Sequence, residues 1–423
     1  MKEILIKNAN VVSPADGING KYDILIKNGR IEDIGENLST DGEVVEASGL
    51  YAIPGLVDMH VHLRDPGQTQ KEDIITGCRA AAAGGVTSLL AMPNTNPTVD
   101  NAATVKYVLD KAKQADANVY VAASITKGLK SEEPTDLDEL KKAGAIALSD
   151  DGRPVVNTKF LNDAMQRAPK LKMSVVAHCE DLYLADGGKI NEGKVSKKLG
   201  VKGIPRAAED CGTAREIALA AALNVPIHIC HVSTETSVEL VRDAKRRGVK
   251  VTAETAPHYF SLTEEELLKR DADYRMNPPL RTAEDVRAII SGLCDGTLDA
   301  VATDHAPHTV EEKADFEKAP NGSIGMETSL AVAVTYLVKT GLLSFEEIVR
   351  KMSTNPAKIL GINAGTLSKG APADIALVDL DEEWTVDVEK LHGKSKNTPF
   401  KGKKLCGKVK KTFLGGKLVF EDN

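Results

Sequence analysis

The segment KEDIITGCRAAAAGGVTSLLAMPN, residues 71–94, decides the fold of the long middle region. Its first half has a helical pattern, and its second half, VTSLLAMPN, is a short apolar strand that ends in the polar residue Asn94. Thr69, with Glu72 three residues later, predicts a capping box at the start of the helix. The segment therefore predicts one helix–strand unit of an alternating α/β region.

The same alternation continues along the chain. Further strand-like segments are VYVAAS, AIALSDDG, SVVAHCED, PIHICHVS, VTAETAPH and AVATDHAPH, and helical stretches such as AATVKYVLDKAKQAD lie between them. Seven or eight such units over about 300 residues predict an α/β fold of the (β/α)8 barrel type. We expect this barrel to span residues 56–364.

The two ends of the chain resemble each other and differ from the middle. Residues 1–55 contain short strands separated by turn sequences such as Asn28-Gly29, and residues 365–423 contain similar strands. We therefore expect residues 1–55 and 365–423 to form one small, discontinuous β-rich domain beside the barrel.

Composition excludes several classes of function. The chain has 423 residues and a net charge of -7, which argues against a nucleic acid partner. It has no apolar run of the roughly 18 residues that a membrane span needs, and its first residues are too charged for a signal peptide. Six cysteines without CxxC spacing favour a reducing compartment, so we expect a cytoplasmic protein that acts on a small molecule.

Histidines and aspartates collect where the predicted strands end, which is where barrel enzymes carry their active sites. The first strand ends in VDMHVHLRDPG, residues 57–67, and alternation along a strand makes His60 and His62 point the same way. The same alternation points Asp151 inward and Asp150 outward. His178, His231 and Asp304 end three further strands. Imidazole and carboxylate groups at one centre predict a site for zinc or a similar transition metal.

Eight motifs in order resemble the dihydroorotases of the amidohydrolase superfamily, and the resemblance covers nearly the whole chain. They are PGLVDMHVHLRDPG, AMPNTNPTVD, SDDG, AHCED, HICHVS, MNPPLR, ATDHAPH and GTLSKGAPADIALVDLD. The closest likeness is to the branch in which an aspartate replaces the superfamily's carboxylated lysine. The resemblance implies one or two zinc ions, with His60, His62 and Asp304 at one, His178 and His231 at the other, and Asp151 bridging.

The resemblance also implies an activity, the reversible cyclisation of N-carbamoyl-L-aspartate to L-dihydroorotate. This is the third step of de novo pyrimidine (UMP) biosynthesis. Asp304 would carry the proton, and the implied substrate contacts are His62, Arg64, Asn94, Asn277, His308, Asn321 and Gly322. The last two belong to a loop at residues 309–325, where the family often has Pro-Phe-Gly and this chain has Pro320-Asn321-Gly322.

Plainer interpretations of these contacts remain open. Arg64 could pair with Asp65 or Asp73, Asn94 and Asn277 could cap turns, and His308 could lie on the surface. A related cyclic-amide hydrolase, such as a hydantoinase, dihydropyrimidinase or allantoinase, is an alternative function, although those enzymes typically carry the carboxylated lysine. A non-catalytic scaffold for aspartate transcarbamoylase is a third. Homodimers, and association with aspartate transcarbamoylase, occur in the family.

Overall fold

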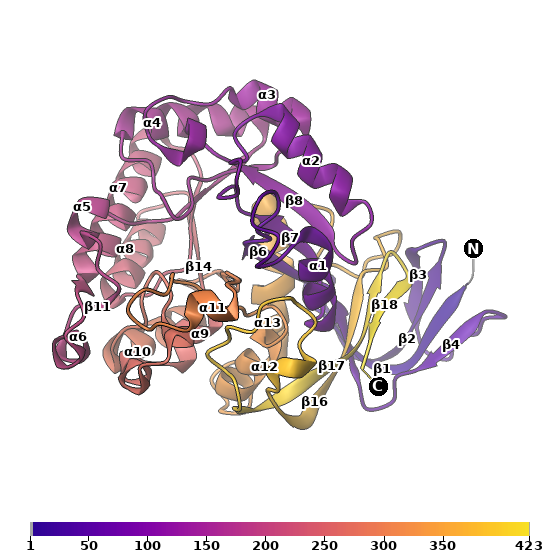
Figure 1. Ribbon diagram of the computed structural model, residues 1–423. Coiled ribbons are helices and arrows are strands. Elements are labelled where there is room, and N and C mark those ends of the chain that lie inside the picture. Colours follow the sequence, from indigo (N-terminus) through magenta and orange to yellow (C-terminus); the bar gives the residue numbers. More distant parts are fainter. Residues whose placement is uncertain (1–2, 423) are drawn as a thin grey trace.

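A closed barrel of eight parallel strands forms the centre of the computed structural model, which describes residues 3–422 (Figure 1). The strands are β6 (Leu56–Val61), β7 (Val86–Ala91), β8 (Asn118–Ala123), β9 (Ala147–Leu148), β10 (Ser174–Ala177), β13 (Ile227–Ile229), β14 (Val251–Thr255) and β15 (Ala300–Val301), in that order around the barrel. Val61 forms a parallel bridge with His305, and the His62 N–H donates to the His305 carbonyl at 2.8 Å. This seam joins the first strand to the last and confirms the predicted barrel.

Helices surround the barrel in Figure 1. They are α1 (Ile74–Ala83), α2 (Ala102–Ala112), α3 (Leu137–Ala143), α4 (Thr158–Arg167), α5 (Leu182–Ala185), α6 (Lys194–Leu199), α7 (Arg206–Leu223), α8 (Glu235–Arg246), α9 (Pro257–Ser261), α10 (Ala283–Cys294), α11 (Val310–Lys313), α12 (Ser329–Ala333), α13 (Phe345–Val349) and α14 (Asn355–Leu360). Short 3-10 turns lie at Lys127–Leu129, Ala168–Leu171, Glu264–Lys269, Ala272–Tyr274 and Val388–Lys390, and π-helical turns at Val334–Val338 and Arg350–Thr354. A two-stranded sheet, β11 (Ile190–Asn191) with β12 (Gly203–Ile204), lies between α5 and α7.

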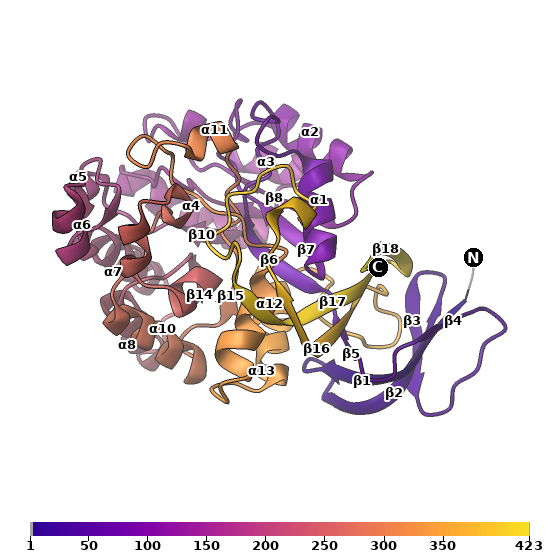
Figure 2. The same ribbon diagram turned by 60° about the horizontal axis from the view of Figure 1, so that its bottom comes forward.

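Strands from both ends of the chain share a second sheet, beside the barrel (Figure 2). Its order is β18 (Lys417–Glu421), β17 (Lys404–Leu414), β16 (Ile375–Thr385), β5 (Tyr51–Pro54), β1 (Ile4–Ser13), β2 (Ile18–Lys27) and β3 (Arg30–Gly35), and β4 (Glu43–Glu46) pairs with β1. The two ends meet where β16 runs antiparallel to β5. The predicted domain limits at residues 55 and 365 stay a prediction, because residues 386–403 leave the sheet and contact barrel loops.

Small and apolar side chains fill the barrel interior beneath the strand ends. The buried cluster there includes Val57, Met59, Leu90, Met92, Ala122, Ala147, Val176, Cys230, Ala300 and Ala302. Polar groups at the carboxyl ends of the strands line a cavity beyond this layer.

The predicted capping box at Thr69 and Glu72 is wrong. The helix begins at Ile74, and its N-cap is Asp73, whose carboxylate accepts from the N–H groups of Ile75 and Thr76, each at 2.9 Å. Glu72 is fully buried and turns toward the C-terminal segment, where it accepts from the backbone N–H of Lys394 at 3.1 Å. A contact more than three hundred residues away therefore outweighs the local capping pattern.

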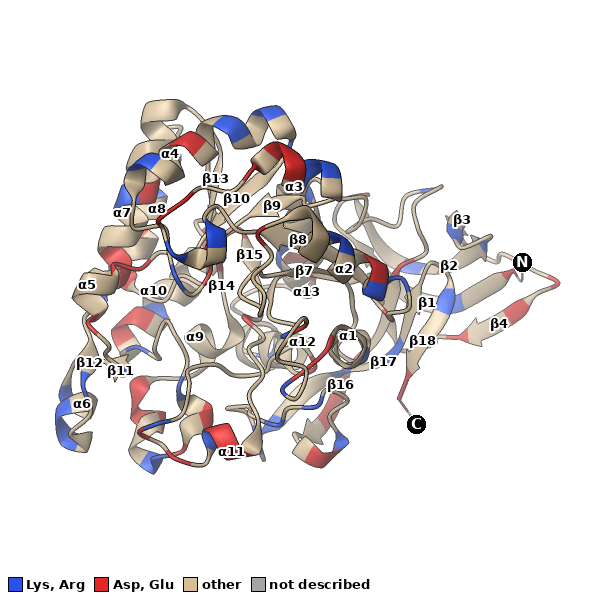
Figure 3. Cartoon of the chain, turned by 45° about the horizontal axis from the view of Figure 1, so that its top comes forward, with Lys and Arg blue, Asp and Glu red and all other residues tan. Residues whose placement is uncertain are grey.

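Figure 3 shows both basic and acidic residues on most of the outer helices, whereas α6 carries lysines without acidic residues. The absence of a nucleic acid partner stays a prediction that rests on the net charge of -7. Among residues 3–422, no helix is both long and apolar enough to cross a membrane.

Candidate metal centre and active site

Six side chains from five strand ends meet at the open end of the barrel, each at most 7% exposed. They are the predicted ligands His60, His62, Asp151, His178, His231 and Asp304. Asp151 lies in the middle, with its Oδ1 at 3.1 Å from His60 Nε2, 3.5 Å from His178 Nδ1 and 3.6 Å from His231 Nε2. Its Oδ2 lies 3.4 Å from His62 Nε2. A carboxylate with imidazoles against both oxygens has the arrangement of a bridging ligand.

Asp304 completes the side of the cluster nearest the first strand. Its Oδ1 lies 3.1 Å from His62 Nε2 and 3.7 Å from His60 Nε2. On the other side, His178 Nδ1 lies 2.9 Å from His231 Nε2. The six predicted ligands therefore form two adjacent groups that share Asp151.

The donor atoms fit a transition metal. Ligand atoms of His60, His62 and Asp151 all lie within 4.8 Å of one another, and so do those of Asp151, His178 and His231. Within the described chain, His60 Nε2 and Asp151 Oδ1 are buried and lack a hydrogen-bond partner, which is costly unless a cation satisfies them. Nitrogen and oxygen donors in this number suit zinc and similar divalent ions.

Buried carboxylates orient two of the imidazoles from behind. His60 directs its Nδ1 at Glu254 Oε1, 3.3 Å away, and the other oxygen of Glu254 lies 3.2 Å from His228 Nε2. His178 directs its Nε2 at Glu180 Oε2, 3.1 Å away. A metal-binding histidine commonly gives its second ring N–H to a carboxylate, which fixes the ring and raises its basicity.

Asn94 and Asn277 have partners within the site. Asn94 Oδ1 accepts from His62 Nδ1 at 2.7 Å, and its amide nitrogen lies 3.4 Å from Asp151 Oδ2. Asn277 donates its amide to both oxygens of Glu180, at 3.2 and 3.3 Å. Both asparagines face the cavity rather than only capping their own turns.

The electrostatics of the cluster keep its carboxylates ionised. Burial alone would raise the pKa of Asp151, but the charge of His60 and the imidazoles packed against the carboxylate hold that pKa well below its usual range. Burial also opposes ionisation of Asp304, and here the hydrogen bond from His62 and the charge of His60 prevail and lower the pKa to about 2. Ionised carboxylates are the form that binds a cation and accepts a proton.

Three site residues hold a left-handed backbone conformation that non-glycine residues rarely adopt. Arg64 has φ 59°, His231 has φ 36° and Asp304 has φ 49°. Asp58 supports the last of these, because its carboxylate accepts from the Thr303 N–H at 3.1 Å. Such strain persists only where the surroundings hold it, and it gathers at functional sites.

Arg64 lies at the mouth of the site and pairs with neither Asp65 nor Asp73. Its Nε donates to the Pro307 carbonyl at 3.1 Å, and its Nη2 lies 3.4 Å from His308 Nε2. Burial lowers the pKa of Arg64 to about 10, which leaves the guanidinium charged near neutral pH. The structure therefore presents one buried, forked cation toward the cavity.

The loop that follows α11 covers the rim. Asn321 accepts from Arg275 Nη2 at 3.0 Å, and the Gly322 N–H donates to the Arg275 carbonyl at 2.9 Å. Gly322 has φ 144°, and a Cβ there would lie 2.8 Å from the Ala306 carbonyl oxygen and 2.9 Å from His308 Nε2. Because the Gly322 N–H already has a partner, the predicted substrate contacts of Asn321 and Gly322 stay predictions.

All predicted site residues except His60 line one cavity of about 440 Å³. A larger cavity of about 680 Å³ lies between the terminal sheet and helices α1 and α12, around Trp384 and Phe420. That cavity contains none of the metal-binding cluster, so the chemistry belongs to the smaller one.

Three supporting residues escaped prediction from the sequence. Glu180 stands in the quoted motif AHCED, two positions after His178, and Glu254 is an acidic residue inside an apolar strand. An acidic residue close to a predicted ligand or inside an apolar strand indicates a carboxylate that is buried with a partner, so the sequence did contain a signal for both residues. The third, Asn397, comes from the C-terminal segment, and nothing in the sequence around it indicates its position beside the site.

Comparison with known proteins agrees with this geometry. Residues 51–419 match the model of the amidohydrolase family, and the chain belongs to that family. A curated dihydroorotase from Acetivibrio thermocellus is 52% identical over 99% of both chains, and one from Geotalea daltonii is 51% identical over 98% of this chain and 99% of its own. Within the amidohydrolases, this chain therefore belongs with the dihydroorotases.

Solved structures show the same fold. The L-hydantoinase (dihydropyrimidinase) from Arthrobacter aurescens superimposes with a TM-score of 0.89 at 26% identity, over 100% of this chain and 96% of that one. A dihydropyrimidinase from Brevibacillus agri gives a TM-score of 0.87 at 27% identity, over 99% and 95%. Family membership and the donor set together indicate a metal cofactor.

Proposed function

We propose that the chain is a zinc-dependent dihydroorotase, which interconverts N-carbamoyl-L-aspartate and L-dihydroorotate in pyrimidine biosynthesis. The observation that carries the proposal is the pairing of a buried, charged Arg64 with the Asp151-centred cluster in one cavity of about 440 Å³. Dihydroorotate is a cyclic amide that bears a carboxylate, so it needs both an anion-binding group and a hydrolytic centre.

Zinc is proposed because the donors are imidazole and carboxylate groups. His60, His62 and Asp304 would hold one ion, His178 and His231 a second, and Asp151 would bridge them. When bound, zinc supplies Lewis-acid chemistry, since it polarises a carbonyl and acidifies a water molecule. Measuring the metal content of the purified protein determines whether one or two ions bind.

The chain's own groups supply binding and proton transfer. Arg64 offers a planar fork that matches the substrate carboxylate, and His308 lies beside that fork. Asp304, ionised and buried, would take the proton of the attacking water and give it to the ring nitrogen as the amide bond breaks. In the cyclisation direction the same carboxyl group would act as the acid. Asn94 and Asn277 can donate amide hydrogen bonds to substrate oxygens.

A hydantoinase or dihydropyrimidinase activity is the second candidate, since the solved neighbours carry those names. Two features favour the first candidate. Asp151 occupies the position where those enzymes typically carry a carboxylated lysine, and identity to curated dihydroorotases is about twice the identity to the solved hydantoinases. A non-catalytic scaffold would not need a complete ligand set, and here all six predicted ligands are brought together.

Cytoplasmic location, a homodimer and association with aspartate transcarbamoylase are also proposals. The first is supported by six cysteines that are all free of disulfides. Sedimentation analysis of the purified chain, alone and mixed with aspartate transcarbamoylase, tests the other two.

One experiment tests the proposed function. Purified protein is assayed with N-carbamoyl-L-aspartate, L-dihydroorotate, hydantoin and dihydrouracil, before and after chelation and after addition of zinc. We expect turnover of the first pair only, loss on chelation and recovery with zinc. Turnover of hydantoin or dihydrouracil in preference to dihydroorotate would favour the second candidate instead.

A further inference from the structure

A buried ion pair lies behind the active site and takes no part in the proposed chemistry. Arg281, the last residue of the motif MNPPLR, places its Nη2 3.2 Å from Glu209 Oε2 on helix α7. The two residues are 2% and 4% exposed, and neither lines the active-site cavity. Two charges removed from water are costly unless they are well bonded, so the contacts around them show what they hold.

Glu209 holds the turn that carries a predicted metal ligand. Its carboxylate accepts from the backbone N–H of Ser233 at 2.8 Å, from that of Thr234 at 3.1 Å, and from the Ser233 hydroxyl. Ser233 lies two residues after His231, whose left-handed backbone needs support from its surroundings. Glu209 therefore fixes the strained turn from which the His231 imidazole projects.

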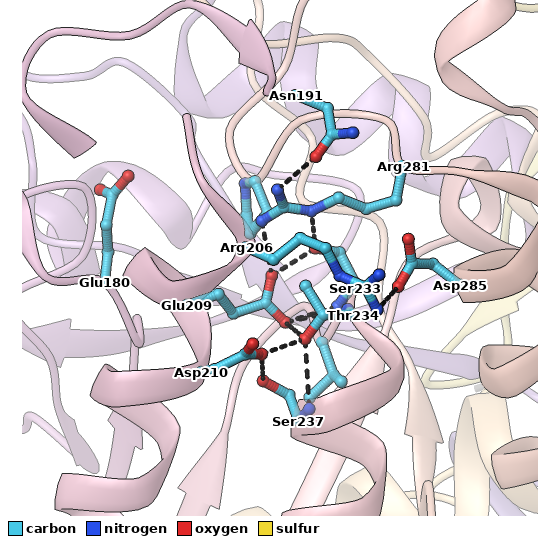
Figure 4. Close-up of polar contacts among 12 residues, drawn as sticks. Glu180, Asn191, Arg206, Glu209, Asp210, Ser233, Thr234, Ser237, Arg281 and Asp285 are labelled. Atoms are coloured by element: carbon cyan, nitrogen blue, oxygen red, sulfur yellow. Dashed lines mark hydrogen bonds and ion pairs between the residues drawn. The ribbon is translucent and has the colours of Figure 1, made fainter. Parts of the chain in front are cut away.

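Arg281 holds the loop on the other side of the site, which carries Asn277. Figure 4 shows its guanidinium between Asn191 and Glu209, where Nη1 donates to Asn191 Oδ1 at 2.8 Å and Nε donates to the Ser233 hydroxyl at 3.0 Å. Arg281 follows Asn277 by four residues, so the same guanidinium anchors the loop that presents the Asn277 amide. The guanidinium reaches these three acceptors from three different nitrogens, a planar arrangement that the single nitrogen of a lysine cannot reproduce.

The first turns of α7 also fix the residue that Asn277 contacts. The Ala208 carbonyl accepts from the Asp181 N–H at 2.7 Å, and a Cβ at Gly212 would lie 2.7 Å from the backbone nitrogen of Glu180. Glu180 accepts from the Asn277 amide. The contacts therefore form a closed ring that runs from α7 through Glu180 and Asn277 to Arg281 and back to α7.

We propose that Arg281 and Glu209 form a positioning pair that keeps Asn277 and His231 at a fixed separation across the site. The pair acts through its neighbours and touches neither substrate nor metal. The proposal rests on the proposed function, because that function assigns Asn277 to the substrate and His231 to the metal. Breaking the pair displaces the Asn277 loop and the His231 turn together, so substrate affinity and metal retention fall in the same variant.

The test compares Arg281→Met and Arg281→Lys with a matched control, Arg206→Met. Arg206 also lies on α7 and pairs with a fully buried acid, Asp285, at 2.6 Å (Figure 4), and its second partner is Glu235, 3.7 Å away at the start of α8, rather than Ser233 or Asn191. For each zinc-loaded variant we measure KM for N-carbamoyl-L-aspartate, kcat, the rate of zinc loss to a chelator, and Tm.

Arg281→Met is expected to raise both KM and the rate of zinc loss about tenfold or more, the usual effect of losing a group that orients a ligand. Arg281→Lys is expected to fall between Arg281→Met and the parent. The control is expected to lower Tm while KM and zinc loss stay within about twofold of the parent, as for a substitution remote from the site. If the role of Arg281 is purely structural, Arg281→Met lowers Tm but has the same KM and the same rate of zinc loss as the control. That result overturns the proposal.

A milder variant covers the case in which Arg281→Met fails to fold. Ser233→Ala removes only the hydroxyl that joins Arg281 to Glu209, and it should raise both readouts by about threefold, the effect of one lost hydrogen bond. Unchanged values in a folded Ser233→Ala protein overturn the proposal. Failure of the parent protein to turn over carbamoyl aspartate would instead reject the proposed function, and the zinc-loss comparison would still test the pair.

Discussion

The side chain of Asn397 accepts a hydrogen bond from the backbone N–H of His308 at 3.1 Å, although the two residues are 89 positions apart. The amide of Asn397 donates to the carbonyls of Ala306 at 3.2 Å and Gly322 at 3.0 Å. One side chain from the C-terminal segment thus fixes both edges of the rim that Arg64 faces.

Replacing Asn397 by alanine should weaken substrate binding without loss of metal. His308 and Gly322 lose a shared anchor, and the loss of about 1–2 kcal/mol of hydrogen bonding predicts a roughly tenfold rise in KM. Asn118→Ala is the control, because Asn118 also joins the barrel to the C-terminal sheet, through Asp374 at 3.2 Å, but far from the site. Equal KM values for the two variants would show that Asn397 does not position the rim.

The neighbouring carboxylates Asp150 and Asp151 should behave differently when changed. Asp151→Ala is expected to lose bound metal and activity, because its two oxygens face four imidazoles. Asp150 instead accepts from the N–H groups of Ile125 and Thr126, at 2.6 and 3.2 Å, so Asp150→Ala should keep most of its metal and lower Tm. Metal analysis and thermal unfolding of both variants decide the matter, and retention of metal by Asp151→Ala would remove it from the ligand set.

Arg64→Met should impair substrate binding and leave metal content unchanged. Loss of a buried, charged, two-pronged contact is expected to cost about 2–5 kcal/mol in kcat/KM. The internal control is zinc content, since Arg64 contacts Pro307 and His308 but no predicted ligand. A variant with the parent's kcat/KM would exclude Arg64 from the substrate site.

Asp304→Asn should reduce both directions of the reaction together, by about 10²–10⁴-fold, the usual contribution of a positioned proton carrier. The amide keeps an oxygen toward His62 but cannot accept the proton. Initial rates from carbamoyl aspartate and from dihydroorotate, each corrected for bound zinc, test this. If one direction is spared, a different group carries the proton.

The sequence predicted the fold and the gathering of four histidines and two aspartates because both depend on short-range regularities. Alternation along single strands placed His60 beside His62 and distinguished Asp151 from Asp150, and the strand ends of a parallel barrel must meet at one face. Contacts of this kind need no knowledge of distant segments.

The residues that escaped prediction depend on long-range packing. Asn397 contacts His308 only once the C-terminal segment has packed against the barrel. Glu72 accepts a hydrogen bond from the backbone of Lys394 instead of capping the nearby helix as predicted. Arg281 was quoted within a motif, but its partner Glu209 lies on a helix 72 residues away. Local pattern cannot specify such pairs, because their energy depends on how the whole barrel closes.

The barrel seam gives the site a further consequence. The first strand meets the segment after the last strand through the Val61–His305 bridge, one backbone hydrogen bond and the hydrogen bonds from Thr303 to Asp58, and His62 and Asp304 stand on opposite sides of that join. An ion bound by both residues would act as a cross-link between positions 242 residues apart, and it would close a long loop of the chain as a disulfide does. Removal of the metal would remove this cross-link. The metal-free protein should therefore begin to unfold at the seam, and β6 and β15 should exchange their amide hydrogens first.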